Sequence, residues 1–176
     1  MLTGAEIRDR VRKDEIYITD FDESRLNPNS YNLRLSDTLM VYDTSDVLDV
    51  KKDNEIKLIS IPDEGYVLEP GILYLASTIE ITKCYDLIPC IDGRSSIGRL
   101  GIFTHVTAGF GDIGFAGKWT LEITVVHPIR IYKGMEICQI YFEEPCGSTE
   151  IKYKGKYQYQ DNPIKSKIYE EFSDNK

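Results

Sequence analysis

The sequence predicts a mainly β protein with one domain, residues 1–176, and three observations lead to this class. At 176 residues, with 41% hydrophobic and 28% charged side chains, the chain is long enough to bury one core but hardly two. From Tyr31 onward, short β-prone runs follow one another, and many of them alternate apolar with polar residues. Gly, Pro, Asp and Asn separate the runs, which favours an antiparallel barrel, jelly roll or sandwich over alternating strands and helices.

One short amphipathic helix is expected ahead of the strands, at residues 3–13. Thr3 is a suitable N-cap, and Ile7 and Val11 are spaced to lie on the same face of a helix. No other part of the sequence has an equally convincing helical pattern. The strands are expected in the runs YNLRL, TLMVY, EIKLI, GYVLE, GILYLAST, WTLEITVV, IRIYK and EICQIYF.

The C-terminal tail, residues 151–176, differs in composition from the strands before it. It mixes Lys, Tyr, Gln and Gly and has little apolar periodicity. Two interpretations are open: a frayed terminus, which composition alone favours, or a mobile segment that a ligand orders.

The charge of the chain argues against a nucleic-acid polymer as a partner. Its 21 Lys and Arg against 29 Asp and Glu give a formal net charge of −8, and an acidic surface repels a phosphate backbone. A small phosphorylated ligand is still compatible, because a few Arg, Lys and backbone N–H groups bind it locally. The N-terminus has no apolar signal region, and no run approaches the roughly 20 apolar residues that span a membrane. We therefore expect a cytoplasmic protein with no membrane partner.

The cysteines and histidines do not indicate a structural metal site. The cysteines lack CxxC spacing and a secretory context, so reduced thiols are expected at Cys84, Cys90, Cys138 and Cys146. His105 and His127 are each more simply explained as satisfied structural residues than as ligands.

Residues 92–101, with the sequence DGRSSIGRLG, concentrate glycines, hydroxyls and two arginines. Glycines permit a close backbone approach, while Ser hydroxyls and Arg guanidinium groups satisfy phosphate oxygens. The segment matches neither a Walker loop nor a dinucleotide-binding fingerprint. Composition therefore leaves two alternatives open, a phosphate site or a glycine-rich turn with surface arginines.

A carboxylate lies within the strand-like run that follows. In a two-residue period Glu122 shares one face with Thr120 and Thr124, while Leu121 and Ile123 occupy the other. Such a carboxylate is either solvated on an outer face or held in a pocket, where burial raises its pKa toward values useful for a base. Composition alone favours the solvated face.

Four motifs follow one another in a specific order: GRSSIGRLG, HVTAGFGDIGFAGKWTLEI, GMEICQI and GKYQYQ. Together they resemble the dCTP deaminases, relatives of the trimeric dUTPases, and the resemblance runs from NPNSYNLRL at 27–35 into the tail. It implies a dUTPase-like distorted antiparallel barrel or jelly roll with a short N-terminal helix, and a flexible tail at 151–176 that acts as a lid. It also implies a hydrolase that deaminates dCTP at cytosine C4, releasing ammonia in the synthesis of dTTP precursors.

The resemblance assigns catalytic roles to individual residues. Glu122 matches the base that takes a proton from the water attacking C4 and then delivers protons toward the departing ammonia. Ser95 and Arg99 would orient that water and stabilise charge. Asp112 matches the aspartate that holds the deoxyribose hydroxyl.

The same resemblance implies the remaining substrate contacts. Thr120 and Leu121 would line the base and sugar pocket. The triphosphate would be bound by Arg94, Ser95, Ser96, Ile97, Gly98 and Arg99, and further nucleotide contacts would come from Gln139, Tyr153, Lys156 and Gln160.

The turn before Asp112 bears on the product. In dUMP-forming members this turn reads Ala-Gly-Phe or Ala-Gly-Trp, and the chain has Gly109 and Phe110 after Ala108. The small glycine would let a second water approach the α-phosphate with help from Asp112, so we expect a bifunctional enzyme that releases dUMP and pyrophosphate. Gly111 and Ile113 depart from the commoner Ile and Pro. The alternatives are a dUTP-forming deaminase, a dUTPase without deaminase activity, and a non-catalytic nucleotide-binding β-barrel.

The resemblance also implies cofactors and partners. Zinc-dependent deaminases need H-x-E and P-C-x-x-C segments, and neither occurs in this sequence, so no zinc and no protein-bound metal are expected. Mg²⁺ is expected only as the partner of the triphosphate. Family members are homotrimers with sites at subunit interfaces, a tail that closes over bound nucleotide, and dTTP as a feedback inhibitor.

Overall fold

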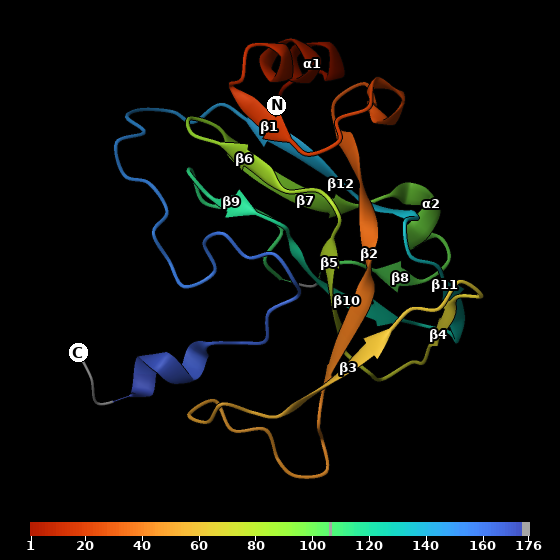
Figure 1. Ribbon diagram of the computed structural model, residues 1–176. Coiled ribbons are helices and arrows are strands. Elements are labelled where there is room, and N and C mark those ends of the chain that lie inside the picture. The colour runs from red at the N-terminus through yellow and green to blue at the C-terminus, as the bar shows by residue number, and fades with distance from the viewer. Residues whose placement is uncertain (106, 174–176) are drawn as a thin grey trace.

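The computed structural model describes residues 1–105 and 107–173, and antiparallel strands make up most of its regular structure (Figure 1). Val106 of the HVTAG motif and residues 174–176 of the predicted lid lie outside the described residues. The strands are β1 (Ile16–Ile18), β2 (Tyr31–Tyr42), β3 (Ile56–Ser60), β4 (Tyr66–Leu68), β5 (Tyr74–Thr78), β6 (Thr82–Cys84), β7 (Ile88–Gly93), β8 (Ile102–Phe103), β9 (Ala116–Gly117), β10 (Thr120–Val125), β11 (Ile129–Ile131) and β12 (Glu136–Glu143).

Seven strands form one curved sheet that curls into a nearly closed barrel. Its order is β7-β12-β2-β5-β10-β8, and β3 pairs with the C-terminal half of β2. The smaller sheets β1-β6-β9 and β4-β11 lie on opposite sides of β2 (Figure 1). The predicted mainly β class is confirmed.

The N-terminal helix forms as the sequence predicts. Helix α1 (Gly4–Arg12) begins after Thr3, whose hydroxyl accepts a hydrogen bond from the Glu6 N–H at 3.2 Å. Ile7 on its inner face is fully buried. One α-helical turn, α2 (Ser95–Gly98), and two 3₁₀ turns, η1 (Glu23–Arg25) and η2 (Ile168–Phe172), are also present and were not predicted. Segments this short have too few residues to display a helical period. None of the described helices is long and apolar enough to cross a membrane.

The predicted strand runs all form strands, and β2 joins two of them. It passes from YNLRL into TLMVY through a register shift between Leu35 and Leu39. Strands β1, β6, β7, β8 and β9 were not predicted, most of them because two or three residues are too few to show alternation. Strand β7 is longer but contains Pro89, a residue that argues against a strand. Pro89 is tolerated because it lacks only a donor, and its carbonyl accepts the Gly111 N–H at 2.7 Å.

A single hydrophobic core fixes the orientation of β10. Leu121 and Ile123 are fully buried, whereas Thr120, Glu122 and Thr124 are half-buried on the opposite face. The alternation predicted for this strand is confirmed. Burial of the apolar face at about 25 cal/mol per Å² holds the strand in this register, since a slip by one residue would expose Leu121 and Ile123.

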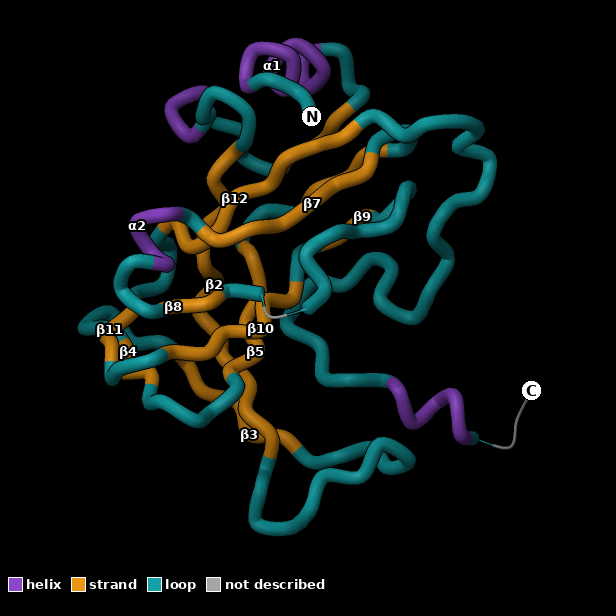
Figure 2. Tube along the Cα trace, turned by 180° about the vertical axis from the view of Figure 1, so that it is seen from behind, coloured by secondary structure: helices purple, strands orange, loops and turns teal. Residues whose placement is uncertain are grey.

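The tail loops out from the strands and adds no strand to the sheets (Figure 2), but it contacts the barrel at β9 and at the residue after it. The Tyr159 N–H donates to the Ala116 carbonyl at 2.8 Å, and the Lys118 N–H donates to the Gln160 carbonyl at 2.9 Å. Gly117 makes this close approach feasible, because its φ is +151° and a Cβ there would lie 2.9 Å from the Gln160 carbonyl oxygen. A frayed terminus, which composition favoured, is therefore not observed between Tyr153 and Ser166.

Candidate functional site

A cavity of about 660 Å³ opens beside β10, between the AGFGD turn (residues 108–112) and the tail. Its walls come from segments far apart in the sequence, including the end of β2, strand β5 and tail residues Ile164 and Ser166. The predicted site residues that line it are Phe110, Asp112, Thr120, Glu122, Tyr153 and Gln160.

Glu122 lies in the wall of this cavity. Its backbone N–H donates to the Thr104 carbonyl at 3.1 Å, and its Cα pairs with that of Leu75 on β5, so two neighbouring segments hold the backbone at this position. The side chain is half-buried. Composition favoured a fully solvated face for Glu122, and the structure instead places it in the cavity, where a carboxylate can act on a bound molecule.

His105 lines the same cavity, which the sequence did not predict. Burial lowers the pKa of His105, and the negative charge of Glu122 acts in the opposite direction. A hydrogen bond with the Ala108 backbone also raises the pKa of His105. His127 is exposed after β10, and the expectation that both histidines are structural residues rather than ligands stays a prediction. The only available signal was the position of His105 within the HVTAG motif.

The AGFGD turn is fastened to β7 by two backbone hydrogen bonds. The Ile91 N–H donates to the Gly109 carbonyl at 2.6 Å, and the Gly111 N–H donates to the carbonyl of Pro89 on the same strand. A Cβ on Gly111 would lie 2.3 Å from the Trp119 ring, so this departure from the commoner isoleucine has a steric cause. A Cβ on Gly109 would lie 3.0 Å from the Ile91 carbonyl oxygen. Both glycines thus allow the turn to pack tightly.

Phe110 and Asp112 project from this turn at the edge of the cavity. Phe110 is 69% exposed, which is unusual for a large apolar side chain at a site rim. Asp112 is also exposed. These side chains are therefore accessible to a ligand that enters the cavity.

The tail contributes the wall opposite the turn. Gln160 is 8% exposed, its Nε2 donates to the Lys118 carbonyl at 2.6 Å, and its Oε1 accepts from the Thr120 hydroxyl at 3.3 Å. The Thr120 hydroxyl in turn accepts the Ile164 N–H at 3.2 Å. Tyr153 packs edge-on against Phe115, with ring centroids 5.9 Å apart. The tail is thus anchored to β10 itself.

The GRSS loop, defined as residues 93–99, lies apart from the cavity at the end of β7. None of its residues lines the cavity, and Ser95, Ser96, Gly98 and Arg99 are exposed while Ile97 is buried. Arg94 is paired with Glu136 at 3.1 Å, and the Gln139 Nε2 donates to the Gly93 carbonyl at 3.1 Å.

Two other predicted contacts also lie outside the cavity. The side chain of Leu121 is fully buried in the core. Lys156 pairs with Glu171 at 2.7 Å and donates to the Lys167 carbonyl at 3.0 Å. The predicted roles of these residues in nucleotide binding stay predictions.

Metal-binding side chains do not gather in the described part of the chain. Within residues 1–105 and 107–173, no three His, Cys, Asp or Glu side chains form a group that could hold a metal ion. All four cysteines are free, and only Cys146 is exposed. Burial raises the pKa of Cys84 to about 12, so this thiol stays protonated and unreactive at neutral pH.

Known proteins resemble this chain over nearly its whole length. A family model described as dCTP deaminase-like matches residues 1–145. A "dCTP deaminase, dUMP-forming" from Hathewaya histolytica is 54% identical over 172 residues, covering 98% of this chain and 99% of that protein. One from Cytophaga hutchinsonii is also 54% identical, covering 98% of each chain. A solved 2'-deoxycytidine 5'-triphosphate deaminase from Agrobacterium tumefaciens superposes with a TM-score of 0.63 at 26% identity, over 82% of this chain and about half (48%) of that chain.

Proposed function

The chain belongs to the dCTP deaminase-like family, and from this membership we propose that it is a dUMP-forming dCTP deaminase. It hydrolyses the C4 amino group of dCTP, releasing ammonia, and then cleaves the triphosphate to give dUMP and pyrophosphate. The observation that carries the proposal is the position of Glu122 in a cavity together with Asp112, Thr120 and Gln160. The names of full-length relatives at 54% identity support it.

Glu122 is the general base and acid of the deamination. It takes a proton from water, the resulting hydroxide adds to C4, and the same carboxyl group then protonates the departing amino group. The C4–N bond breaks, ammonia leaves, and C4 keeps the oxygen as the uracil carbonyl. His105, whose pKa burial lowers, stays uncharged and does not neutralise Glu122 at neutral pH.

The AGFGD turn supports the second step. Water attacks the α-phosphorus, and the bond to the bridging oxygen of the β-phosphate breaks to release pyrophosphate. Asp112 is exposed at the edge of the cavity, where it can assist this water, and Gly109 lets the turn that carries Asp112 pack against the Ile91 carbonyl of β7. Relatives that are named as dUMP-forming dCTP deaminases support dUMP as the product.

The active enzyme in this proposal is a cytoplasmic homotrimer, in which the GRSS loop of one subunit completes the cavity of another. The separation of this loop from Glu122 within one chain supports the arrangement. The loop contributes Arg94, Ser95 and Arg99 toward the triphosphate, which carries Mg²⁺, and no zinc takes part. The tail from residue 151 closes over the nucleotide, and dTTP acts as a feedback inhibitor at the same site.

Product analysis from dCTP tests the proposal. The expected result is ammonia release without added zinc, with pyrophosphate formed in step with ammonia and no free dUTP. Ammonia accompanied by accumulating dUTP would identify a dUTP-forming deaminase. Activity confined to dUTP would identify a dUTPase, and binding of dCTP without turnover would identify a non-catalytic module.

A further inference from the structure

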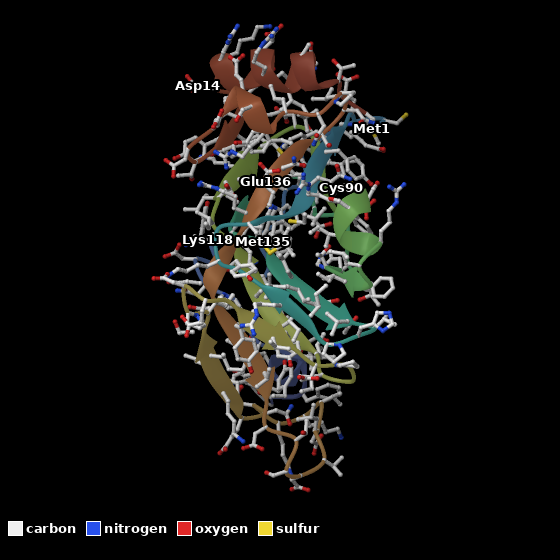
Figure 3. The ribbon with its side chains drawn as sticks, turned by 90° about the vertical axis from the view of Figure 1, so that its right-hand side faces the viewer. Met1, Asp14, Cys90, Lys118, Met135 and Glu136 are labelled. Carbon is white, nitrogen blue, oxygen red and sulfur yellow. The ribbon has the colours of Figure 1, made fainter. Side chains whose placement is uncertain are left out.

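A closed ring of polar side chains surrounds the start of the GRSS loop. We call it the polar ring, and it joins three strands that are adjacent in the order β7-β12-β2. Glu136, labelled in Figure 3, is its acidic member and lies at the start of β12. The other members are Asn27, Ser30, Asn32, Gly93, Arg94 and Gln139.

The charged half of the ring holds Arg94. Its Nη1 donates to the Glu136 carbonyl at 2.8 Å, and its Nη2 lies 3.1 Å from Glu136 Oε2. The same Oε2 accepts the Asn32 Nδ2 at 2.8 Å. A register shift between Glu136 and Cys138 lies at this point of β12, and such bulges re-aim side chains. Both terminal nitrogens of Arg94 are therefore fixed by a single acidic residue.

The neutral half of the ring connects Asn32 to the backbone of the GRSS loop through uncharged side chains. Asn32 Oδ1 accepts from the Asn27 Nδ2 at 2.8 Å, and Asn27 also donates to the Ser30 hydroxyl oxygen at 3.1 Å. The Ser30 hydroxyl donates to Gln139 Oε1 at 2.8 Å, and the Gln139 Nε2 donates to the Gly93 carbonyl at 3.1 Å. Because Gly93 precedes Arg94, the circuit of hydrogen bonds closes.

Burial makes this ring a rigid support. Ser30 and Asn32 are each 5% exposed, and buried polar groups are costly unless their hydrogen bonds are made. The side chains of Arg94 and Glu136 are 29% and 32% exposed, so both remain accessible to a ligand at the loop. The ring thus fixes Arg94 from the protein side while its side chain stays partly exposed.

We infer that Glu136 is a positioning residue that also sets the affinity of the GRSS loop for polyphosphate. It aims the Arg94 guanidinium, and its negative charge opposes a polyanion at the same loop. The inference rests on the proposed assignment of this loop to the triphosphate. Asn32 shares the positioning role without a charge, because it donates to the Glu136 carboxylate that holds Arg94.

Two substitutions in the ring have opposite expected effects. Glu136→Gln keeps the shape of the side chain and an oxygen acceptor for Asn32 and Arg94, but it removes the charge. The dissociation constant for inorganic tripolyphosphate should fall about threefold to tenfold, and the difference should shrink as ionic strength rises. Asn32→Ala breaks the ring without changing its charge, so the dissociation constant should rise. A residue that only stabilised the fold would not produce opposite, salt-dependent shifts.

The experiment is calorimetric titration of the full chain with sodium tripolyphosphate at low and high salt. Glu143→Gln is the matched control, because Glu143 is an exposed residue at the other end of β12. Equal affinities for Glu136→Gln and the control would overturn the inference, as would tighter binding by Asn32→Ala or no binding by the unsubstituted chain. Steady-state assays should show a lower KM for dCTP in Glu136→Gln with kcat nearly unchanged. Tripolyphosphate binding without dCTP turnover would refute the proposed function and leave the role of Glu136 intact.

Discussion

The GRSS loop and the cavity that contains Glu122 are supported by different parts of the structure. The cavity is assembled from strand β10, a glycine-rich turn and the tail, and among the described residues that line it there is no Lys or Arg. The loop carries Arg94 and Arg99, and the polar ring fixes its first residues from behind. One region thus carries Glu122, the proposed proton-transfer group, and the other carries the cations. Since a triphosphate needs cations, we expect that neither region binds and converts dCTP alone.

The largest effect is expected from removing the acid-base group of the cavity. Glu122→Gln keeps the size of the side chain but cannot accept a proton from water, so kcat for ammonia release should fall by roughly 10²–10⁴-fold. Binding of dCTP should persist, because the cations of the GRSS loop are untouched. Ammonia assays and calorimetry measure the two quantities, with Glu143→Gln as an exposed control. Unchanged turnover would place the base elsewhere.

A mixture of two inactive variants tests whether the two regions meet across a subunit interface. Glu122→Gln and Arg99→Ala each disable one region, and each should be inactive alone. After subunit exchange, some sites combine an intact Glu122 with an intact Arg99 from a neighbouring subunit. Random mixing should restore about a quarter of the wild-type rate per site. If mass spectrometry shows mixed trimers while the mixture stays inactive, the two regions do not form shared sites.

The sequence predicts the cavity better than it predicts the loop's support. The alternation around Glu122 is local, so a two-residue period identifies its face, and the resemblance of the motifs predicts its role. Ser30, Asn32 and Glu136 approach one another only because β2 and β12 pair in a particular register. No local pattern encodes that register, and the polar ring was therefore not predicted.

Other differences between the predicted and the observed structure also have physical causes. Strand β7 was missed because Pro89 argues against a strand, although its carbonyl can still accept a hydrogen bond. His105 was taken as structural because an isolated histidine gives no sign of the cavity it faces. The tail was ambiguous because its contacts with Thr120 and Lys118 join residues about forty positions apart.

A smaller effect is expected where the tail is attached to the cavity rim. The Tyr42 hydroxyl accepts the Ser166 N–H at 2.7 Å, and Lys165 pairs with Asp53 at 2.8 Å. Tyr42→Phe removes one hydrogen bond, which contributes about 1 kcal/mol, so KM for dCTP should rise about fivefold. Limited proteolysis should cut the tail faster in this variant. Tyr17→Phe, at an exposed position on β1, is the control. Equal proteolysis and KM would show that the tail does not depend on Tyr42.

The smallest effect is expected from His105 and concerns how the stability of the protein depends on pH. Burial lowers the pKa of His105 in the folded state, so the unfolded chain binds this proton more readily. The neutral His105 therefore does not lower stability above the unfolded histidine pKa of about 6.5. The free energy of unfolding falls as pH decreases from there toward the folded-state pKa of His105. Replacing His105 with Asn should therefore flatten the fall in urea midpoint between about pH 7 and 5. Replacing the exposed His127 with Asn should leave this fall unchanged. If the urea midpoint depends on pH in the same way in both variants, the cavity around Glu122 is as well solvated as the surface.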